Sequence, residues 1–233
     1  MSMQALDMHL EPPAPVWGVG RVRVGGQAVP WPVSHEDMHD ETAVAAAQLA
    51  ACGFAAGDTV LLVSMLSHAI NVGPLEYAAA RLGGLYSAAE ATPYDAYRAA
   101  ALCRQLAPRV VVGVCAETIQ GLQESGFDPA AVFGAVPVVA TADDEAHAAL
   151  VALGMAPRRW LRLGPTTALE CAARRGAHYD ADRWAVEPDG PRLVLTNRAP
   201  RLTPSRRLPL DVVGGIETAP CECGSAQPRI VPR

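Results

Sequence analysis

Short runs of apolar, β-branched residues alternate with amphipathic stretches through the first two thirds of the chain. Apolar runs bounded by Gly, Pro or Asp are typical of buried strands, and apolar positions three or four apart are typical of helices. The pattern predicts strands over residues 57–65, 84–89, 108–114 and 136–142. It predicts helices over 34–53, 68–83, 93–107, 116–126 and 143–154. This alternation indicates an α/β fold with a doubly wound, mostly parallel sheet that is covered on both faces.

Both ends of the chain show a different pattern. Residues 17–33 alternate around Gly25-Gly26, which predicts a β-hairpin after an extended lead-in. After residue 155 the segments RWLRLG, RWAVEP, PRLVLTN and RIVP predict short antiparallel strands. We therefore predict three parts: the lead-in and β-hairpin over 1–33, an α/β subdomain over 34–156, and a smaller β-rich subdomain over 157–233.

The composition of the chain excludes several classes of partner and of chemistry. Of the 233 residues, 50% are hydrophobic and 18% charged, as expected of a globular protein. The net charge of −5 with no basic block argues against a nucleic-acid partner. No apolar run suits a membrane span and the start resembles no secretory signal, so we expect a cytoplasmic protein. All 19 basic residues are arginines, which excludes lysine-based chemistry such as a Schiff base or a phosphate-loop lysine.

Polar residues follow the first strand predicted within the α/β part. Ser64 lies at the end of this strand and Ser67 and His68 follow it, at the edge where open α/β sheets place ligands. We take His68 and Ser64 as candidate catalytic residues. Ser67 is equally consistent with a helix-capping role. His35 and His39 are spaced as metal ligands on a helix, but an acidic, solvated helix start explains them as well.

Five segments in a fixed order resemble one family. They are LAACGFAAGDTVLLVSM, GPLEYAAARLGGLYSAA, LCRQLAPRVVVGV, ECAARRGAH and CECGSAQPRI, and they resemble phenylacetate–CoA ligases of the adenylate-forming superfamily. The likeness covers roughly residues 20–230. It implies an acyl-CoA ligase core fold, with an acyl or aromatic-acid pocket near His68. It also places Thr166, Thr167 and Glu170 near the acyl group, which makes Glu170 a third catalytic candidate.

The nucleotide motifs of such ligases are largely absent. Residues 21–33 stand where the Ser/Thr/Gly-rich phosphate loop belongs, and Pro30 and Pro32 remove backbone donors there. Residues 157–163 lack the carboxylate of the adenine and magnesium motif. Such ligases also carry an Arg-Tyr-Arg-Thr-Gly-Asp motif, which matches residues 206–211 here. Only Arg206 and Asp211 of that motif remain, and Asp211 marks a vestigial ribose position. We therefore expect a truncated ligase-like chain, matching neither the region before the phosphate loop nor the C-terminal domain, that does not adenylate acids.

Four potential metal ligands lie in two segments. Cys171 and His178 are seven residues apart, and Cys221 and Cys223 form a C-x-C pair. Three thiolates and one imidazole suit tetrahedral zinc with no position left open for water, so we predict a structural zinc site. Asp180 or Asp182 is the expected support for His178. The alternative is an incidental C-x-C pair with Cys171 buried in the core.

Two functional classes follow. In the first, the chain is a pseudoenzyme that binds an acyl or aromatic thioester or an acyl carrier protein, as a homodimer or a hetero-oligomer. In the second, it is an ATP-independent cyclase, hydrolase or isomerase that reuses the acyl pocket in a biosynthetic pathway. An open pocket with His68 beside Ser64, Glu90 or Glu170 favours the enzyme, and a closed apolar edge favours the scaffold.

Overall fold

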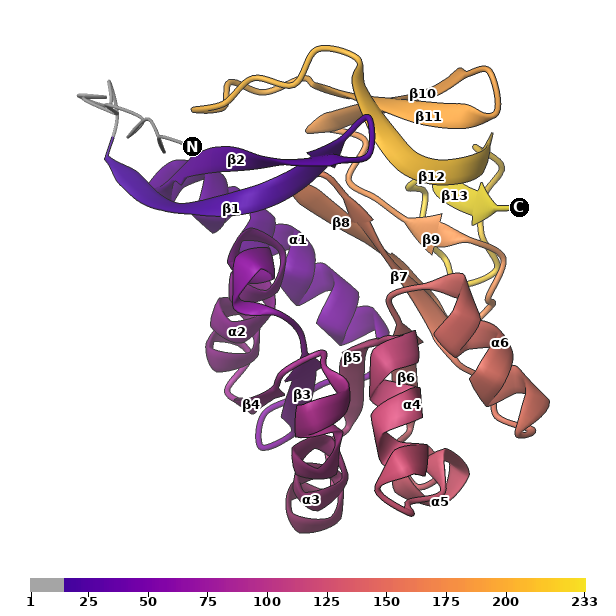
Figure 1. Cartoon of the computed structure of the whole chain (residues 1–233). Helices are drawn as coiled ribbons and strands as arrows, with labels where there is room; N and C mark the ends of the chain where they lie inside the picture. The colour runs from indigo at the N-terminus through magenta and orange to yellow at the C-terminus, as the bar shows by residue number, and fades with distance from the viewer. Residues whose placement is uncertain (1–14) are drawn as a thin grey trace, which may run out of the picture.

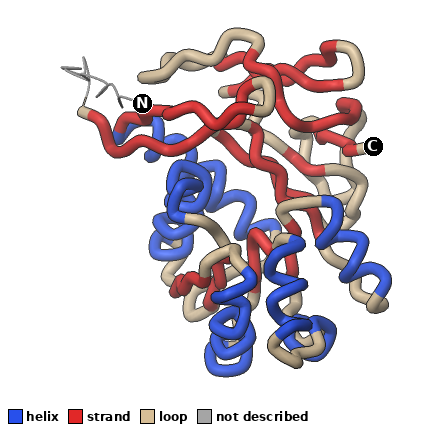
Figure 2. The backbone as a smooth tube through the Cα atoms, in the orientation of Figure 1, coloured by secondary structure: helices blue, strands red, loops and turns tan. Residues whose placement is uncertain are grey.

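The computed structural model describes residues 15–233, and most of the predicted lead-in lies outside this range. Eleven strands pair into one large sheet, and a two-stranded hairpin lies beside it (Figure 1). The first half of the large sheet is flanked by helices, whereas strands and loops dominate the second half (Figure 2). The pairing changes from parallel to antiparallel at β7 (Arg158–Leu163).

The parallel half has the doubly wound arrangement that the sequence predicts. Its strands are β3 (Thr59–Val63), β4 (Leu85–Ala89), β5 (Val110–Val114) and β6 (Val138–Thr141), in the order β4-β3-β5-β6. All pairs are parallel, and β6 also pairs parallel with β7. The chain winds first toward β4 and then back past β3 to β5, which confirms the predicted fold class.

Helices cover both faces of this half. One face carries α1 (His35–Ala51) and α2 (Ala69–Arg81). The other face carries α3 (Ala96–Leu106), α4 (Ala116–Glu124), α5 (Pro129–Phe133) and α6 (Asp144–Ala152). Two 3₁₀ turns, η1 (Leu66–His68) and η2 (Pro93–Asp95), precede α2 and α3. Within residues 15–233, no helix has the length and apolar character to cross a membrane.

Strand alternation explains why both faces are covered. On β3, Val60 and Leu62 pack with α1 and α2, whereas Leu61 and Val63 pack with the helices of the opposite face. All five β3 residues are therefore buried, and the strand reads as a continuous apolar run. Helix α1 starts where predicted: Ser34 Oγ accepts from the Asp37 N–H at 3.0 Å, and Asp37 accepts from the Ser34 N–H at 2.9 Å.

The antiparallel half contains more strands than the sequence predicts. After β7 come β8 (Thr166–Glu170), β9 (Ala177–His178), β10 (Trp184–Asp189), β11 (Arg192–Asn197), β12 (Leu208–Glu217) and β13 (Arg229–Pro232). Their order is β7-β8-β9-β13-β12-β11-β10. The pattern missed β8 because all five of its residues are buried, which leaves no polar alternation. It missed β12 because Pro209, Gly214 and Gly215 are more typical of loops.

The hairpin forms as predicted. Strands β1 (Val16–Val24) and β2 (Gln27–Ser34) pair across a turn in which Gly25 and Gly26 have φ of +59° and +83°. Both values lie in the left-handed region that glycine adopts without strain. The hairpin's buried side chains Val22, Trp31 and Val33 belong to the core cluster of the antiparallel half.

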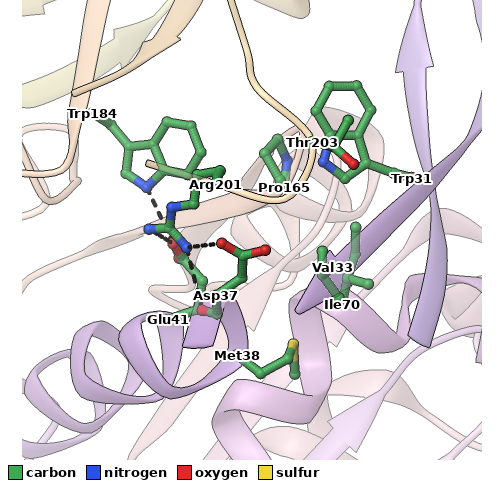
Figure 3. Close-up of a pocket in the computed structure, with 10 residues that line it drawn as sticks. All are labelled: Trp31, Val33, Asp37, Met38, Glu41, Ile70, Pro165, Trp184, Arg201 and Thr203. Carbon is green, nitrogen blue, oxygen red and sulfur yellow. Dashed lines mark hydrogen bonds and ion pairs between the residues drawn. The ribbon is translucent and has the colours of Figure 1, made fainter. Parts of the chain in front are cut away.

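A buried charge network holds α1 against the antiparallel half (Figure 3). An Arg201 Nη atom lies 2.8 Å from Glu41 Oε1, and the guanidinium stacks over the Trp184 ring at 4.8 Å. Trp184 Nε1 and Thr166 Oγ1 also donate to the Glu41 carboxylate, at 3.1 and 2.6 Å. Burial raises the pKa of Glu41, and Arg201 opposes that rise. The pair therefore joins segments that are 160 residues apart in the chain.

Replacing Arg201 with methionine should lower the free energy of unfolding by about 3–5 kcal/mol, because Glu41 then keeps a buried charge without its cation. Urea unfolding followed by circular dichroism measures the loss. Arg98→Met is the matched control, because the pair that Arg98 forms with Asp95 is largely exposed on the arginine side and should contribute at most about 1 kcal/mol. Similar small losses in both variants would contradict a stabilising role for the network.

Candidate functional site: an arginine-lined cavity and a cysteine–histidine cluster

A cavity of about 550 Å³ lies beyond the carboxyl ends of β3 and β6. Its walls come from the hairpin, η1, the start of α6, β7, β12 and the end of β13. The direction of winding reverses between β3 and β5, and open α/β sheets place ligands at such a switch point. The charged residues that line it are Arg21, Arg23, Arg159, Arg162 and Arg233, together with Asp143, Asp144 and Asp211.

Arginines outnumber carboxylates around this cavity. Two of the five arginines form ion pairs within it, Arg159 with Asp144 and Arg23 with Asp211, each at 3.3 Å. Asp143 is occupied differently, because its carboxylate accepts the N–H groups of Ala146 at 2.7 Å and Ala116 at 3.1 Å. The remaining guanidinium donors give the cavity a cationic character that suits carboxylate or phosphate groups.

His68 lines the cavity and contacts Arg162. The two side chains approach to 2.5 Å between Arg162 Nη1 and His68 Nε2. Because arginine only donates, Nε2 must accept, and the imidazole is neutral. Burial, followed by the charge of Arg162, lowers the pKa of His68 to about 4. The Nε2 lone pair is thus already engaged and is not free to take a proton from a ligand.

The other two catalytic candidates lie elsewhere. Ser64 does not line the cavity, and its hydroxyl donates to the Met65 carbonyl at 3.2 Å. Glu170 is buried, accepts the Arg159 N–H at 2.8 Å, and lines a separate groove beside α1. The structure therefore does not bring Ser64, His68 and Glu170 into one site.

Asp211, the residue at the predicted vestigial ribose position, lies on the wall of the cavity. Arg23 of the hairpin forms an ion pair with it, and the Arg23 side chain is largely exposed whereas that of Asp211 is partly exposed. The sequence reasoning missed the arginines. Arg21-x-Arg23 was a usable signal, because alternate residues of a strand share a face and arginine is the chain's only strong cation.

The four predicted metal ligands do converge. Cys171 Sγ and Cys221 Sγ are 3.6 Å apart, and Cys223 Sγ lies 3.4 Å from His178 Nε2. All four ligand atoms lie within 4.8 Å of one another, so they could hold a single metal ion. β8 ends just before Cys171, β9 contains His178, and the turn before β13 supplies both other thiols.

Local contacts orient this cluster. His178 Nδ1 lies 2.8 Å from the Gln227 carbonyl, which assigns the ring proton to Nδ1 and leaves Nε2 free toward the thiols. The expected supports differ: Asp180 accepts from Arg183 and from the Asp182 N–H instead. The Cys223 N–H lowers the pKa of Cys221 to about 6, whereas burial raises that of Cys171 to about 11.

Comparison with known proteins identifies the fold. No protein-family model and no curated protein matches this sequence. A 2-hydroxyisobutyryl-CoA ligase, in an open conformation with 2-HIB-AMP and CoA, superposes with a TM-score of 0.73 and 15% identity, over 92% of this chain and 56% of the ligase. The NpsA N-terminal subdomain of Klebsiella oxytoca, in complex with 3-hydroxyanthranilyl-AMSN, gives 0.57 and 12%, over 91% of this chain and 57% of the subdomain.

These structures are acyl-CoA ligases and adenylation subdomains, and the chain has their fold. The resemblance of the sequence segments to adenylate-forming ligases is therefore confirmed at the level of fold. The chain spans little more than half of the length of these two structures.

Burial, together with the charge of Arg162, should hold His68 neutral at pH 6. The pKa of His68 is about 4 in the folded chain and ~6.5 in the unfolded chain. Between these pH values the unfolded chain binds the proton and the folded chain does not, so protonation favours unfolding. The free energy of unfolding should therefore decrease as the pH falls from about 6.5 to 4. Arg162→Gln should raise the His68 pKa, since it removes the neighbouring charge. NMR titration of the imidazole measures both, and a wild-type midpoint near 6.5 would refute the neutral assignment.

Proposed function

We propose that this chain binds a small acyl or aromatic acid, or its thioester, in the arginine-lined cavity and does not convert it to an acyl adenylate. The cavity itself carries this proposal. Its volume of about 550 Å³ falls in the range of small-molecule sites, which is roughly 300–1,000 Å³. Its guanidinium groups suit a carboxylate or the phosphates of a coenzyme-linked thioester, because arginine binds both in a bidentate manner.

The hairpin argues against adenylation. A phosphate loop needs free backbone N–H groups, but β1 and β2 pair with each other along almost their whole length. Pro30 and Pro32 contribute no donors on β2. Asp211, at the position that resembles the ribose contact, already faces Arg23. With no lysine in the chain, these features support a protein that retains an acyl site without nucleotide chemistry.

The ligands of the similar structures support the acyl part of the proposal. The ligase holds 2-HIB-AMP with CoA, and the NpsA subdomain holds an acyl-AMSN compound. An acyl group on CoA or on a carrier protein is the thioester form of such a ligand. The ATP-independent enzyme receives less support, because Ser64 and Glu170 lie outside the cavity and His68 Nε2 is engaged by Arg162.

Arg159→Gln should weaken ligand binding about 10- to 100-fold, because a hydrogen bond to a charged group contributes roughly 1.5–3 kcal/mol. Isothermal titration with benzoate and benzoyl-CoA as probes measures this change. Arg98→Gln, on α3 outside the cavity, should bind as wild type.

Mg-ATP should neither bind with micromolar affinity nor support pyrophosphate exchange with benzoate. Micromolar ATP binding would contradict the loss of nucleotide chemistry. Unchanged benzoate and benzoyl-CoA affinity in Arg159→Gln would contradict the cavity assignment. The two results are independent, so each part of the proposal can fail alone.

We further propose that Cys171, His178, Cys221 and Cys223 bind one structural zinc ion. Tetrahedral zinc, with bonds of about 2.3 Å to sulfur and 2.0 Å to nitrogen, separates two sulfurs by about 3.8 Å and sulfur from nitrogen by about 3.5 Å. The observed separations of 3.6 and 3.4 Å fit these values. Four protein ligands leave no position for water, so the ion would join β8 and β9 to the turn before β13 and take no part in chemistry.

Purified protein should therefore contain about one zinc per chain by elemental analysis. Cys223→Ser should reduce the zinc content and lower the melting temperature, because metal binding contributes to folding free energy. Cys103→Ala removes a thiol from α3, outside the cluster, and should keep its zinc. Stoichiometric zinc in Cys223→Ser, with wild-type resistance to chelators, would rule out Cys223 as a ligand.

A further inference from the structure

Strand β4 leaves one edge of the large sheet open. It is the last strand in the order, so within residues 15–233 only β3 pairs with it. The ribbon shows it at the outer side of the helical half (Figure 1). Its sequence, LYSAA, has no charge and no proline, and Leu85 and Tyr86 are 64% and 51% exposed. An uncharged, exposed edge of this kind is a template for another strand.

The opposite edge of the same sheet is different. It is formed by β10, which carries Glu187, Pro188 and Asp189 in its second half. Charges and proline on an edge strand disfavour further pairing, and natural sheets use them for that purpose. The sheet is therefore protected at β10 and unprotected at β4.

Exposed tyrosines lie on β4 and on the segments that flank it in the chain. Four of the chain's five tyrosines fall between residues 77 and 97, at positions 77, 86, 94 and 97. All four have substantially exposed side chains, and Tyr94 is 90% exposed. Tyr77 lies on α2 and Tyr97 on α3, the two helices that pack against β4. Tyrosine is enriched at protein interfaces, where its ring is buried and its hydroxyl finds a partner.

We propose that a second copy of this chain pairs antiparallel along β4, with the two-fold axis at Ser87. This register aligns the whole strand: Ser87 lies opposite Ser87, Tyr86 opposite Ala88, and Leu85 opposite Ala89 of the second copy. Tyr86 and Ala88 point to the same face, since they align with Val60 and Leu62 of β3. Each large side chain therefore meets a small one, and the two-fold axis repeats both matches.

This self-complementarity selects a second copy as the partner. A two-fold interface uses one patch twice, so its residues must fit themselves. The five residues of β4 meet that condition without placing like charges opposite one another, although each chain has a net charge of −5. Tyr77, Tyr86 and Tyr97 are only 46–55% exposed, so each of them can bury about half of the ~150–250 Å² of a whole tyrosine in such an interface.

Sedimentation velocity over a concentration series tests the proposal on the full chain. Wild type should form dimers, and Ala88→Glu should be monomeric at the same concentrations, because it places two carboxylates in the shared strand pair. Ala152→Glu, at the exposed end of α6, is the matched control and should remain dimeric. Circular dichroism melting confirms that each variant folds.

A cysteine cross-link tests the register. In an antiparallel pair, opposite Cα atoms lie about 4.5–5.5 Å apart, within the range of a disulfide, so Ser87→Cys should give a reducible covalent dimer. Leu85→Cys should not, since two copies of residue 85 would lie about 13 Å apart along the strands. Wild type carries exposed Cys223 and serves as background. A monomeric wild type, a dimeric Ala88→Glu, or a Ser87→Cys that cross-links no better than wild type would overturn the proposal.

Discussion

Strand β7 determines how the two halves of this molecule fit together. It pairs parallel with β6 on one side and antiparallel with β8 on the other, so one sheet runs through both halves. The same strand supplies Trp160 to the core beneath α1 and α2, and Leu163 to the core of the antiparallel half. It also carries Arg159 and Arg162 to the cavity. The cavity's position thus follows from the change in strand direction at β7.

Helix starts and turns that depend on neighbouring residues could be predicted from the sequence. The polar side chains of Ser34 and Asp37 and the glycine pair at the hairpin turn gave correct starts and turns, because caps and turns depend on neighbouring residues. The buried strands of the parallel half were also predicted, because their continuous apolar runs differ clearly from the amphipathic pattern of the helices on either side. Strand β8 was missed because tertiary contacts bury every one of its residues and remove the alternation.

The grouping of site residues could be predicted for the cysteine–histidine cluster but not for the three catalytic candidates. The cysteines and His178 could be grouped because their residue types share one strong use, and the structure brings them together. Ser64, His68 and Glu170 were grouped through the ends of strands and a resemblance. A position at the end of a strand does not determine which way the side chain points or which neighbouring residue it contacts. Glu170 turns to the Arg159 backbone, and His68 turns to Arg162, a partner 94 residues away.

The hairpin shares no ladder hydrogen bond with the large sheet in the described part of the chain. A lone two-stranded hairpin is marginal in water, so its position depends on the apolar contacts of Val22, Trp31 and Val33 and on a few polar links such as Thr203 to Pro32. Side-chain contacts can slide by small steps, whereas paired strands shift only by whole residues. The wall of the cavity that carries Arg21 and Arg23 is therefore positioned by side-chain contacts and not by the register of the large sheet.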